Sequence, residues 1–431
     1  MEDKNIKVHQ NMLEFCGKPV VELAEKYGTP LYVMDEMMIR NRLKTFKQAM
    51  KDAFDEKAEV LYASKACDFL AMYRLIQEEN VGVDVVSDGE IFTAYKAGFP
   101  MGKAYFHGNN KTDSEIRFAM ECGVGTFVVD GEDELEALNQ IASQYNRVQK
   151  ILIRVTPGID PHTYEAVSTG IVDCKFGSAI VTGAARALTQ KALAMEHIEL
   201  VGFHCHVGSQ VFDGDVFMKC ADVMFRFVKE ISKEFNYTCK QLNLGGGYGV
   251  PYVSEDPRLD VYQILMSVGA HVKRLCQIYD MQLPQILMEP GRSIVADAGI
   301  TLYRVGSVKK IPGAKNYVSV DGGMTDNPRY ALYRSKYTMV CANRMNEKTE
   351  LRCSVVGKCC ESGDILQENV MLPETICRND VIAVLTTGAY NYSMASNYNR
   401  IVRPAVVMIA GTDEKVVVQR EKFEDLIKNE L

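Results

Sequence analysis

Between residues 60 and 288 the chain repeats one pattern: a short apolar run, then a longer segment whose apolar residues recur at helical spacing. The runs cover residues 60–64, 83–87, 104–107, 126–129, 151–155, 200–204, 241–244 and 285–288. Segments such as residues 132–145 and 216–235 have charged faces opposite their apolar ones, as helices that cover a sheet do. Strands alternating with helices form right-handed βαβ units and a parallel sheet. Eight units predict a closed (β/α)8 TIM barrel, and an open doubly wound sheet is the alternative.

The sequence changes character after about residue 300. Strand-like runs follow one another there with little helix between them, at residues 303–308, 317–320, 351–356, 381–385, 404–408 and 415–419. Gly, Pro, Asn and Asp turns join them, which predicts a separate antiparallel β-domain, built as a barrel or sandwich. Residues 29–33 form one more strand-like run that could join this domain. We therefore expect the barrel over residues 36–298 and the β-domain over residues 1–35 and 299–431.

Composition argues against several partners and locations. The net charge is -7 and no cluster of basic residues exists, so nucleic acid and anionic membranes are not expected partners. No uncharged apolar run is long enough to span a bilayer, and the first residues contain no signal-type apolar core. The 13 cysteines include no Cys-x-x-Cys pair, which favours reduced thiols over a zinc ribbon or redox dithiol. A cytoplasmic protein is expected.

Reactive side chains gather at the carboxyl ends of the predicted strands. In (β/α)8 enzymes the loops after these ends form the active site. Lys65 follows the first run, residues 107–110 the third, residues 204–210 the sixth, residues 245–247 the seventh and residues 289–292 the eighth. We expect these side chains to meet at one end of the barrel.

Residues 242–249 lead a predicted strand into three consecutive glycines, Gly245, Gly246 and Gly247. Such a run gives up side-chain packing and backbone entropy, so bare backbone must approach something closely. Successive backbone N–H groups bind anions, which predicts a phosphate here. The run lacks the Lys-Ser/Thr of a P-loop, and Val250 replaces the last glycine of a dinucleotide fingerprint. A tight turn without a ligand is the alternative.

Lys65 and Glu289 suit a cofactor that carries both a phosphate and an aldehyde. A lysine desolvated at the end of an apolar strand becomes an amine nucleophile able to form a Schiff base. Pyridoxal phosphate needs that amine, a phosphate cradle and an anionic partner for its ring nitrogen, and Glu289 suits the last role. His206 could lie against the ring, while Ser209 and Arg292 are candidates for the phosphate or a substrate carboxylate.

Each of these residues also has a purely structural interpretation. Lys65 could simply extend from the strand end into solvent. His204 and His206 could be hydrogen-bonded core residues, and since their spacing shows no third zinc ligand, no metal site is expected. Arg292 could form an ion pair with Glu289 on the same loop.

The order of these motifs resembles the alanine-racemase-like class of pyridoxal-phosphate enzymes, and within it the diaminopimelate decarboxylases. The resemblance runs almost from end to end, starting at residues 28–36 and finishing at residues 388–396. The matching segments between them are residues 62–66, 106–111, 204–210, 245–247, 289–292 and 360–364. The resemblance implies a barrel plus a β-domain, in agreement with the strand count.

The resemblance also implies a role for individual residues. Lys65 would hold pyridoxal 5′-phosphate as a Schiff base, His206 would stack on its ring and Glu289 would pair with its ring nitrogen. Other cofactor contacts would come from Ser209, Gly245, Gly246, Gly247, Gly291, Arg292 and Tyr390. Substrate contacts would come from Arg292, Arg329, Tyr333, Glu361 and Tyr390.

In the family, Cys360 and Glu361 reach the site from the second subunit, so a homodimer with a shared active site is expected. The implied reaction is decarboxylation of meso-2,6-diaminopimelate to L-lysine, the last step of lysine biosynthesis. Cys360 or Lys65 would return the proton. Arginines suit a distal carboxylate and Glu361 a distal ammonium, which favours a substrate that is an amino acid at both ends.

Three alternatives remain open. A related decarboxylase could act on D-lysine, D-ornithine or a carboxylated polyamine, but Arg329 would then be a buried charge without a carboxylate. A racemase of the same barrel class would not need the segment around Cys360 and Glu361 or the large β-domain. A catalytically inactive regulatory homologue would not need both Lys65 and Cys360.

Overall fold

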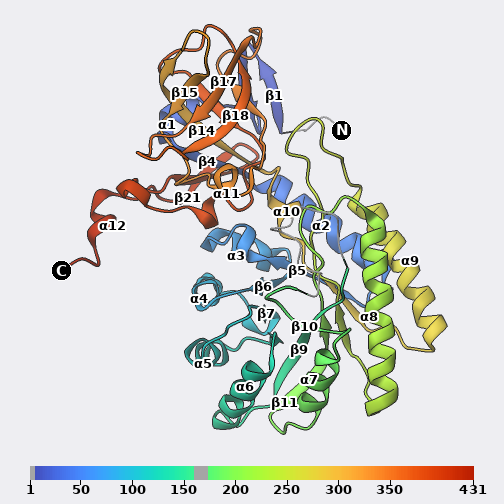
Figure 1. Cartoon of the computed structure of the whole chain (residues 1–431). Coiled ribbons are helices and arrows are strands. Elements are labelled where there is room, and N and C mark those ends of the chain that lie inside the picture. The colour runs from blue at the N-terminus through green and yellow to red at the C-terminus, as the bar shows by residue number, and fades with distance from the viewer. Residues whose placement is uncertain (1–4, 160–172) are drawn as a thin grey trace. The chain divides into compact units, whose positions relative to one another are not determined.

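The computed structural model describes residues 5–159 and 173–431. The chain forms two compact units (Figure 1). The first, here called the barrel unit, comprises Arg42–Val250 and Pro257–Ser293. The second, the β unit, comprises Met1–Asn41, Pro251–Asp256 and Ile294–Leu431.

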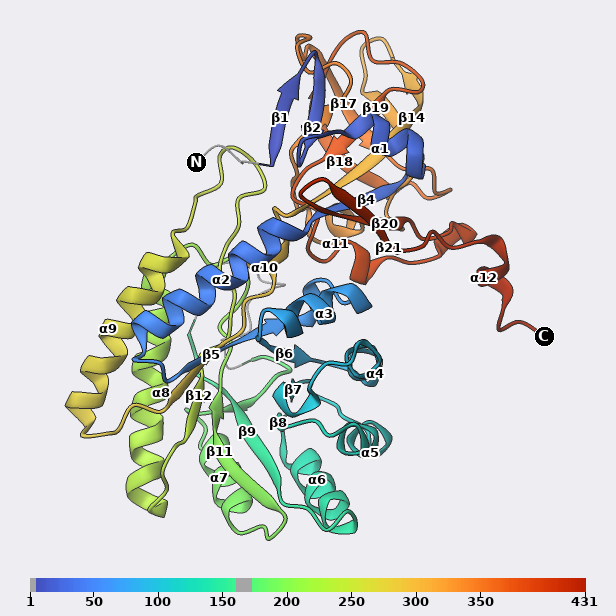
Figure 2. The same ribbon diagram turned by 180° about the vertical axis from the view of Figure 1, so that it is seen from behind.

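Eight parallel strands close into a ring in the barrel unit. They are β5 (Ala58–Ala63), β6 (Gly82–Val85), β7 (Ala104–Phe106), β8 (Thr126–Val129), β9 (Gln149–Thr156), β11 (Ile198–His204), β12 (Gln241–Asn243) and β13 (Gln285–Met288). Around the ring the order is β9-β11-β12-β13-β5-β6-β7-β8, and β8 pairs with β9 to close it. Figure 2 shows β8 next to β9. A short strand, β10 (Ser178–Ala179), pairs with β9 outside the ring. Each of the eight predicted runs overlaps one ring strand, so the (β/α)8 prediction is confirmed and the open sheet is excluded.

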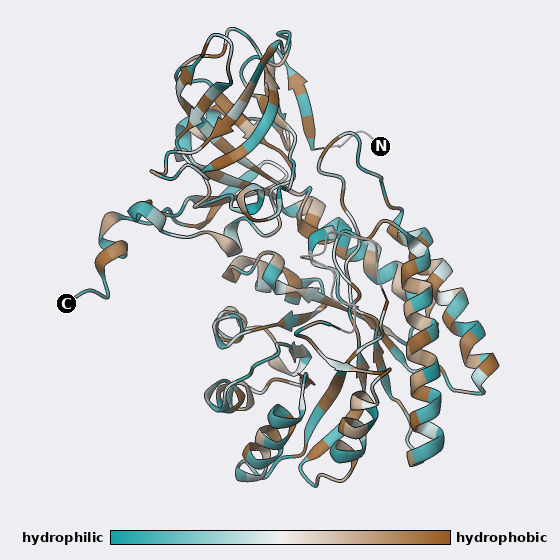
Figure 3. Cartoon of the chain, viewed as in Figure 1, coloured by the Kyte–Doolittle hydropathy of each residue, from teal (hydrophilic) through white to brown (hydrophobic). Residues whose placement is uncertain are grey.

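Amphipathic helices connect the strands. They are α2 (Glu36–Ala53), which precedes β5, α3 (Leu70–Glu78), α4 (Asp88–Ala97), α5 (Asp113–Cys122), α6 (Glu132–Gln144), α7 (Ala184–Leu193), α8 (Gly214–Phe235) and α9 (Val261–Tyr279). On α6, Leu135, Leu138, Ile141 and Ala142 are buried on one face, as the spacing predicts. Figure 3 shows hydrophobic and hydrophilic residues alternating in the same way along α8 and α9.

Apolar side chains from six of the eight strands form one cluster in the barrel unit. Its members, each at most 5% exposed, are Leu61, Tyr105, Val128, Leu152, Val201 and Leu287. Because the interior of such a barrel is a packed core, reactive groups have room only at the ends of the strands.

The β unit is built around β14 (Gly299–Lys309). Its other strands are β1 (Ile6–His9), β2 (Met12–Phe15), β3 (Lys18–Pro19), β4 (Leu31–Asp35), β15 (Asn316–Val320), β16 (Met339–Cys341), β17 (Leu351–Val356), β18 (Ile365–Leu372), β19 (Val381–Val384), β20 (Ala405–Ala410) and β21 (Asp413–Val418). Its helices are α1 (Val20–Tyr27), α10 (Arg292–Val295), which begins in the barrel unit, α11 (Arg329–Tyr333) and α12 (Phe423–Ile427). β14 pairs antiparallel with β15, β19 and β4.

The N-terminal strand β4 shares its sheet with strands from the C-terminal part of the chain. Its pairing with β14 confirms that residues 29–33 return to this domain. Most ladders are antiparallel as expected, and two are parallel, β4 with β20 and β15 with β17. No helix among the described residues is long and apolar enough to cross a membrane. All 13 cysteines are free thiols.

Candidate active site

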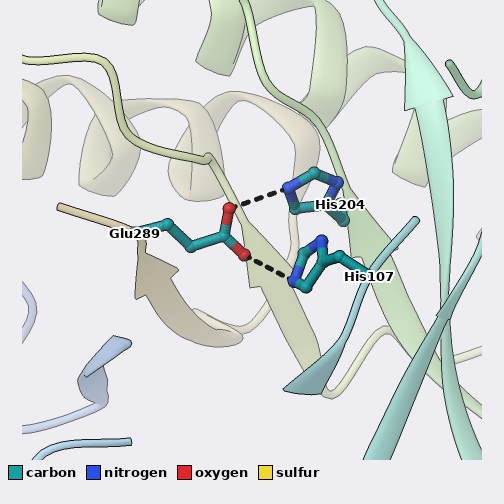
Figure 4. Close-up of side chains that lie close together, drawn as sticks. All are labelled: His107, His204 and Glu289. Atoms are coloured by element: carbon teal, nitrogen blue, oxygen red, sulfur yellow. Dashed lines mark hydrogen bonds and ion pairs between the residues drawn. The ribbon is translucent and has the colours of Figure 1, made fainter. Parts of the chain in front are cut away.

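The carboxylate of Glu289, directly after β13, is the centre of a buried polar cluster at the carboxyl ends of the barrel strands. His107 Nε2 lies 3.0 Å from its Oε1, and His204 Nε2 lies 3.0 Å from its Oε2 (Figure 4). Asn243, at the end of β12, donates its side-chain N–H to Oε1 at 2.6 Å. Glu289 is only 7% exposed. A carboxylate so buried stays charged only when polar partners surround it in this way.

The two imidazoles favour the ionised form of Glu289. Burial alone raises the pKa of this carboxyl, but His107 and His204 outweigh burial and hold the pKa well below its usual value. Burial lowers the pKa of His204 from 6.5 to about 4, against the opposing charge of Glu289. His204 is therefore neutral at pH 7, and its Nε2 proton points to the carboxylate.

Protonation of His204 should destabilise the fold in acid. An unfolded histidine titrates near pH 6.5 and folded His204 near pH 4, so the unfolded state binds the proton first. The stability contribution is complete above pH 6.5 and is lost as the pH falls towards 4. The free energy of unfolding should drop by about 2 kcal/mol between pH 7 and pH 4.5 from this residue alone.

Urea unfolding of the wild type and His204→Gln at several pH values measures this contribution. Glutamine keeps an N–H donor for Glu289 but does not titrate, so the variant should lose less stability on acidification. His9→Gln is the control, because the His9 side chain is 65% exposed. Equal pH slopes for the wild type and His204→Gln would contradict the low pKa of His204.

Asp84, in β6, belongs to the same cluster and was not singled out from the sequence. It is 2% exposed, and its Oδ1 lies 3.7 Å from His107 Nε2. Burial raises the pKa of Asp84, while the charges of His107 and Lys65 oppose that rise. The signal was present in the sequence, because an acidic residue inside an apolar strand is unusual.

Asn243 is a second residue that the sequence analysis did not single out. Besides holding Glu289, its Oδ1 accepts the N–H of Gly245 at 2.9 Å. Asn243 is fully buried and so ties the end of β13 to the start of the glycine run. Asn243 lies just before the three glycines. The glycines were the informative feature of this segment, and one asparagine before them gave no separate signal.

The three glycines are required because other backbone crosses them closely. A Cβ at Gly245 would lie 2.5 Å from the carbonyl oxygen of Cys205, and one at Gly246 would lie 2.0 Å from that of Glu289. Gly247 is equally crowded and has a φ of +105°. The sequence predicted that something approaches the glycine backbone closely. Backbone carbonyls at the ends of neighbouring strands do so, whether or not a phosphate also binds.

Two amides of the glycine run donate to side chains of the site. The N–H of Gly245 reaches Asn243, and that of Gly246 reaches His206 Nδ1 at 3.3 Å. His206 therefore carries its proton on Nε2. Burial, helped by the charge of Lys65, lowers the pKa of His206 well below its usual value, so this ring is neutral.

Lys65 stands on a single 3₁₀ turn, Ser64–Ala66, directly after β5. Ser64 is fully buried, and its hydroxyl lies 2.7 Å from Asp84 O and 2.7 Å from Glu90 Oε2, which fixes the residue before Lys65. Lys65 itself is exposed. The exposure agrees with the alternative in which Lys65 extends into solvent, and the desolvation expected at the strand end is not seen.

Ser209 and Arg292, the two candidates for an anionic group, lie together. Nε and Nη2 of Arg292 are 3.3 and 3.2 Å from Ser209 Oγ. Arg292 is 6% exposed. The neighbouring Gly291 lets β13 approach β5, because a Cβ there would lie 2.9 Å from the Cβ of Ala63.

Arg329, on α11 of the β unit, lies between two tyrosine rings. Its guanidinium carbon is 5.1 Å from the ring centre of Tyr333 and 5.3 Å from that of Tyr390. Arg329 is 6% exposed, and its Nε has no hydrogen-bond partner among the described residues. A nearly buried guanidinium with an unused donor is suited to binding an anion.

Cys360 and Glu361 lie on an exposed turn between β17 and β18, also in the β unit. The Oε1 of Glu361 accepts the N–H of Gly363 at 3.1 Å. The expected site residues thus form one group in the barrel unit and a second group in the β unit, each described here within its own unit.

His107, His204 and Glu289 also have the spacing of a metal site, with ligand atoms within 4.8 Å of one another. The sequence showed no third ligand beside the histidines because these residues come from different strand ends. Glu289 already partners both imidazoles, so the cluster is explained without an ion and no metal is assigned.

Comparisons with known proteins agree with this arrangement. The family described as pyridoxal-dependent decarboxylase, pyridoxal binding domain, matches residues 37–296. The diaminopimelate decarboxylase of Bacillus subtilis (strain 168) is 46% identical over 419 residues, 97% of this chain and 95% of the relative.

Solved structures give the same result. Diaminopimelate decarboxylase from M. jannaschii in co-complex with L-lysine has a TM-score of 0.91 and 33% identity, covering 100% of this chain and 98% of that one. A lysine/ornithine decarboxylase from Vibrio vulnificus complexed with cadaverine has a TM-score of 0.75 at 21% identity, covering 90% and 97%, which shows a shared fold alone. The chain therefore belongs to the pyridoxal-dependent decarboxylases and, within them, to the diaminopimelate decarboxylase family.

Proposed function

We propose that this enzyme decarboxylates meso-2,6-diaminopimelate to L-lysine, the last step of lysine biosynthesis, with pyridoxal 5′-phosphate at the carboxyl ends of the barrel strands. The observation that carries the proposal is the buried, ionised Glu289 in the cluster of His107, His204 and Asn243. Relatives named diaminopimelate decarboxylase match 97% to 100% of the chain, and the M. jannaschii enzyme was solved with L-lysine, the expected product.

Glu289 fits the ring nitrogen of pyridoxal phosphate. A carboxylate offers about four lone-pair sites, and the hydrogen bonds from His204 and Asn243 use two of them, which leaves room for a protonated ring nitrogen. His206 is neutral and could lie against the ring without adding a charge. The donors for the phosphate would be Ser209, Arg292 and the glycine run. Within the run Gly247 is the best candidate, because the N–H groups of Gly245 and Gly246 already donate to side chains of the site.

The chain's own residues would divide the work of the reaction. The bound cofactor supplies an electron sink for the pair of electrons left by the departing carboxylate. Glu289 keeps the ring nitrogen protonated, because its low pKa makes it a permanent negative charge at working pH. Lys65 would hold the cofactor through its aldehyde and would also be available to carry a proton.

Residues of the β unit would select the substrate. Arg329 would bind the distal carboxylate, since its buried position and unused Nε call for an anion. Tyr333 and Tyr390, already against its guanidinium, would shape that pocket. Glu361 would bind the distal ammonium and Cys360 would return a proton to the substrate carbon.

We further propose that the active enzyme is a homodimer in which Cys360 and Glu361 complete the partner's site. Both residues are exposed on one turn, as a group that acts on a second subunit must be.

A cytoplasmic location is supported by the 13 free thiols. We also propose domain limits of 36–298 for the barrel and of 1–35 with 299–431 for the β-domain; the compact units differ from these limits at residues 36–41, 251–256 and 294–298, which lie in the β unit.

A decarboxylase for D-lysine, D-ornithine or a carboxylated polyamine is the second candidate. It is less favoured because these substrates lack the distal carboxylate that the buried Arg329 calls for. An inactive regulatory homologue would have no use for the ionised Glu289 or for Lys65 at the same barrel end.

Carbon dioxide release from the purified enzyme, loaded with pyridoxal phosphate, tests the proposal. The substrates are meso-diaminopimelate, D-lysine, D-ornithine, L-lysine and L-ornithine at equal concentrations. Meso-diaminopimelate should be decarboxylated at least about a hundredfold faster than the others, because each of them leaves Arg329 unpaired. Equal or faster release from D-lysine or D-ornithine would overturn the substrate assignment, and no release from any substrate would overturn the enzyme assignment.

A further inference from the structure

The backbone at Cys360 is held by two side chains from elsewhere in the β unit. The N–H of Cys359 donates to Asp364 Oδ2 at 2.7 Å, and the N–H of Cys360 donates to Asn399 Oδ1 at 2.7 Å. Two consecutive amides thus donate to two different side chains. The backbone at Cys360 sets the direction of the Cα–Cβ bond, and so the region that the thiol can reach.

Asp364 anchors the inner side of the turn. It is 3% exposed, and its Oδ1 accepts the N–H of Met324 at 2.6 Å. The surrounding backbone is packed against its carboxylate, since a Cβ at Gly323 or Gly357 would lie 2.5 or 2.2 Å from a carboxylate oxygen. The Cys359 amide therefore has a rigid partner.

Asn399 holds the outer side. It is an exposed residue in the turn Tyr398–Arg400 and has a φ of +53°, in the left-handed region. Asparagine tolerates this conformation better than most residues with a side chain. The bond to Cys360 joins residues that are 39 apart in sequence, so it does not arise from local turn geometry.

Hydrogen bonds from the C-terminal segment fix the turn that carries Asn399. Glu421 Oε2 accepts the side-chain N–H of Asn397 at 2.6 Å and the backbone N–H of Arg403 at 2.8 Å. Arg400 donates to the carbonyl of Leu426, in α12, at 3.1 Å. The flanks of Asn399 are thus tied down on both sides, although its own side chain is exposed.

We propose that Asn399 is a positioning residue for Cys360, and that its Oδ1 sets the direction of the thiol that returns a proton to the substrate carbon. The proposal rests on the proposed role of Cys360. Without the acceptor, the Cys360 amide has only water as a partner, and the outer side of the turn can move while Asp364 still holds the inner side.

Two substitutions distinguish the effect of losing the acceptor oxygen from the effect of changing the backbone conformation. Asn399→Gly removes the acceptor and accommodates a positive φ, whereas Asn399→Asp keeps an acceptor oxygen and also tolerates this conformation. Asn399→Gly should lower kcat for meso-diaminopimelate about three- to tenfold, the scale of one hydrogen bond, and should change KM little. Asn399→Asp should recover most of that loss. Asn379→Gly is the matched control, because Asn379 is also exposed with a positive φ of 74°.

Alkylation of the holoenzyme by iodoacetamide, followed by mass spectrometry, supplies a readout other than activity. Cys360 and Cys377 are the two exposed cysteines of the described chain, so Cys377 is an internal reference. The ratio of alkylation at Cys360 to that at Cys377 should rise in Asn399→Gly and stay near the wild-type value in Asn399→Asp. An unchanged ratio in Asn399→Gly, or equal losses of kcat in both variants, would overturn the proposal.

The Cys360→Ala background distinguishes this inference from the proposed function. If Asn399 acts through Cys360, Asn399→Gly should reduce kcat no further in Cys360→Ala. A further loss of the same size would overturn the inference and leave the proposed function intact. Wild-type activity of Cys360→Ala alone would instead remove the proposed role of Cys360, and with it the ground for the inference.

Discussion

Lys65→Ala should abolish decarboxylation and the visible absorbance of bound cofactor together. Lys65 is the one lysine on the strand-end loops that the sequence and the structure place beside the Glu289 cluster, and its charge acts on both His206 and Asp84. Lys111, on the loop after β7, also carries an amine, but its Nζ already donates to Glu134 Oε1 at 2.8 Å. We expect a loss of kcat of roughly 10⁴-fold or more, the scale observed when a covalent nucleophile is removed from an enzyme.

Absorbance after dialysis and carbon dioxide release measure the two effects on the same preparation. Lys273→Ala is the control, because Lys273 is a partly exposed barrel-unit lysine paired with Asp55, so its removal changes charge without touching the site. The variant should fold normally, since Lys65 is exposed and contributes little buried surface. A coloured and active Lys65→Ala protein would rule out this lysine as the attachment point.

Mixing Lys65→Ala with Cys360→Ala protein extends the same experiment to the dimer. If the site is shared between subunits, each mixed dimer contains one intact site, so about a quarter of all sites should be active in a random mixture of C2 dimers. Dimers shown to be mixed by mass spectrometry but still inactive would contradict the shared site.

The barrel could be predicted from sequence because its signal is local. Each strand is a short apolar run, and each helix shows its own period, as residues 132–145 did for α6. The carboxyl ends then follow from the direction of the chain, which is how Lys65, His206, Arg292 and Glu289 could be assigned to one end of the barrel. Closure of the barrel, which the pairing of β8 with β9 completes, was inferred from the number of βα units alone. Nothing in the sequences of these two strands shows that they pair with each other.

The contacts inside the site could not be predicted in this way. Asn243 holds Glu289 across two neighbouring strands, and that contact depends on the register between β12 and β13. The glycines illustrate the same limit. Their need for close approach was evident, but only the structure shows that the carbonyls of Cys205 and Glu289 are among the atoms approached. Similarly, the exposure of Lys65 depends on where one turn leaves the strand.

Glu289→Gln should reduce kcat by about 10² to 10³-fold, the scale of removing a preorganised charge from an active site. The substitution preserves size but removes the negative charge that keeps the cofactor ring nitrogen protonated. Glutamine also has one side-chain oxygen, whereas the two oxygens of Glu289 lie against His107, His204 and Asn243. Polar groups of the cluster therefore lose an acceptor. Because Lys65 is untouched, the cofactor should still attach covalently, and this distinguishes the variant from Lys65→Ala.

Steady-state kinetics together with absorbance spectra over a range of pH test this expectation. The bound cofactor of Glu289→Gln should be present in normal amount but with an altered spectrum, because its ring is no longer held in the protonated form. Glu59→Gln is the matched control, since Glu59 is a partly buried carboxylate at the opposite end of the barrel, in β5, and burial raises its pKa. That variant should keep wild-type kcat. If Glu289→Gln also kept wild-type kcat, the carboxylate would be only a structural partner of the two histidines, and catalysis would not depend on it to keep the ring nitrogen protonated.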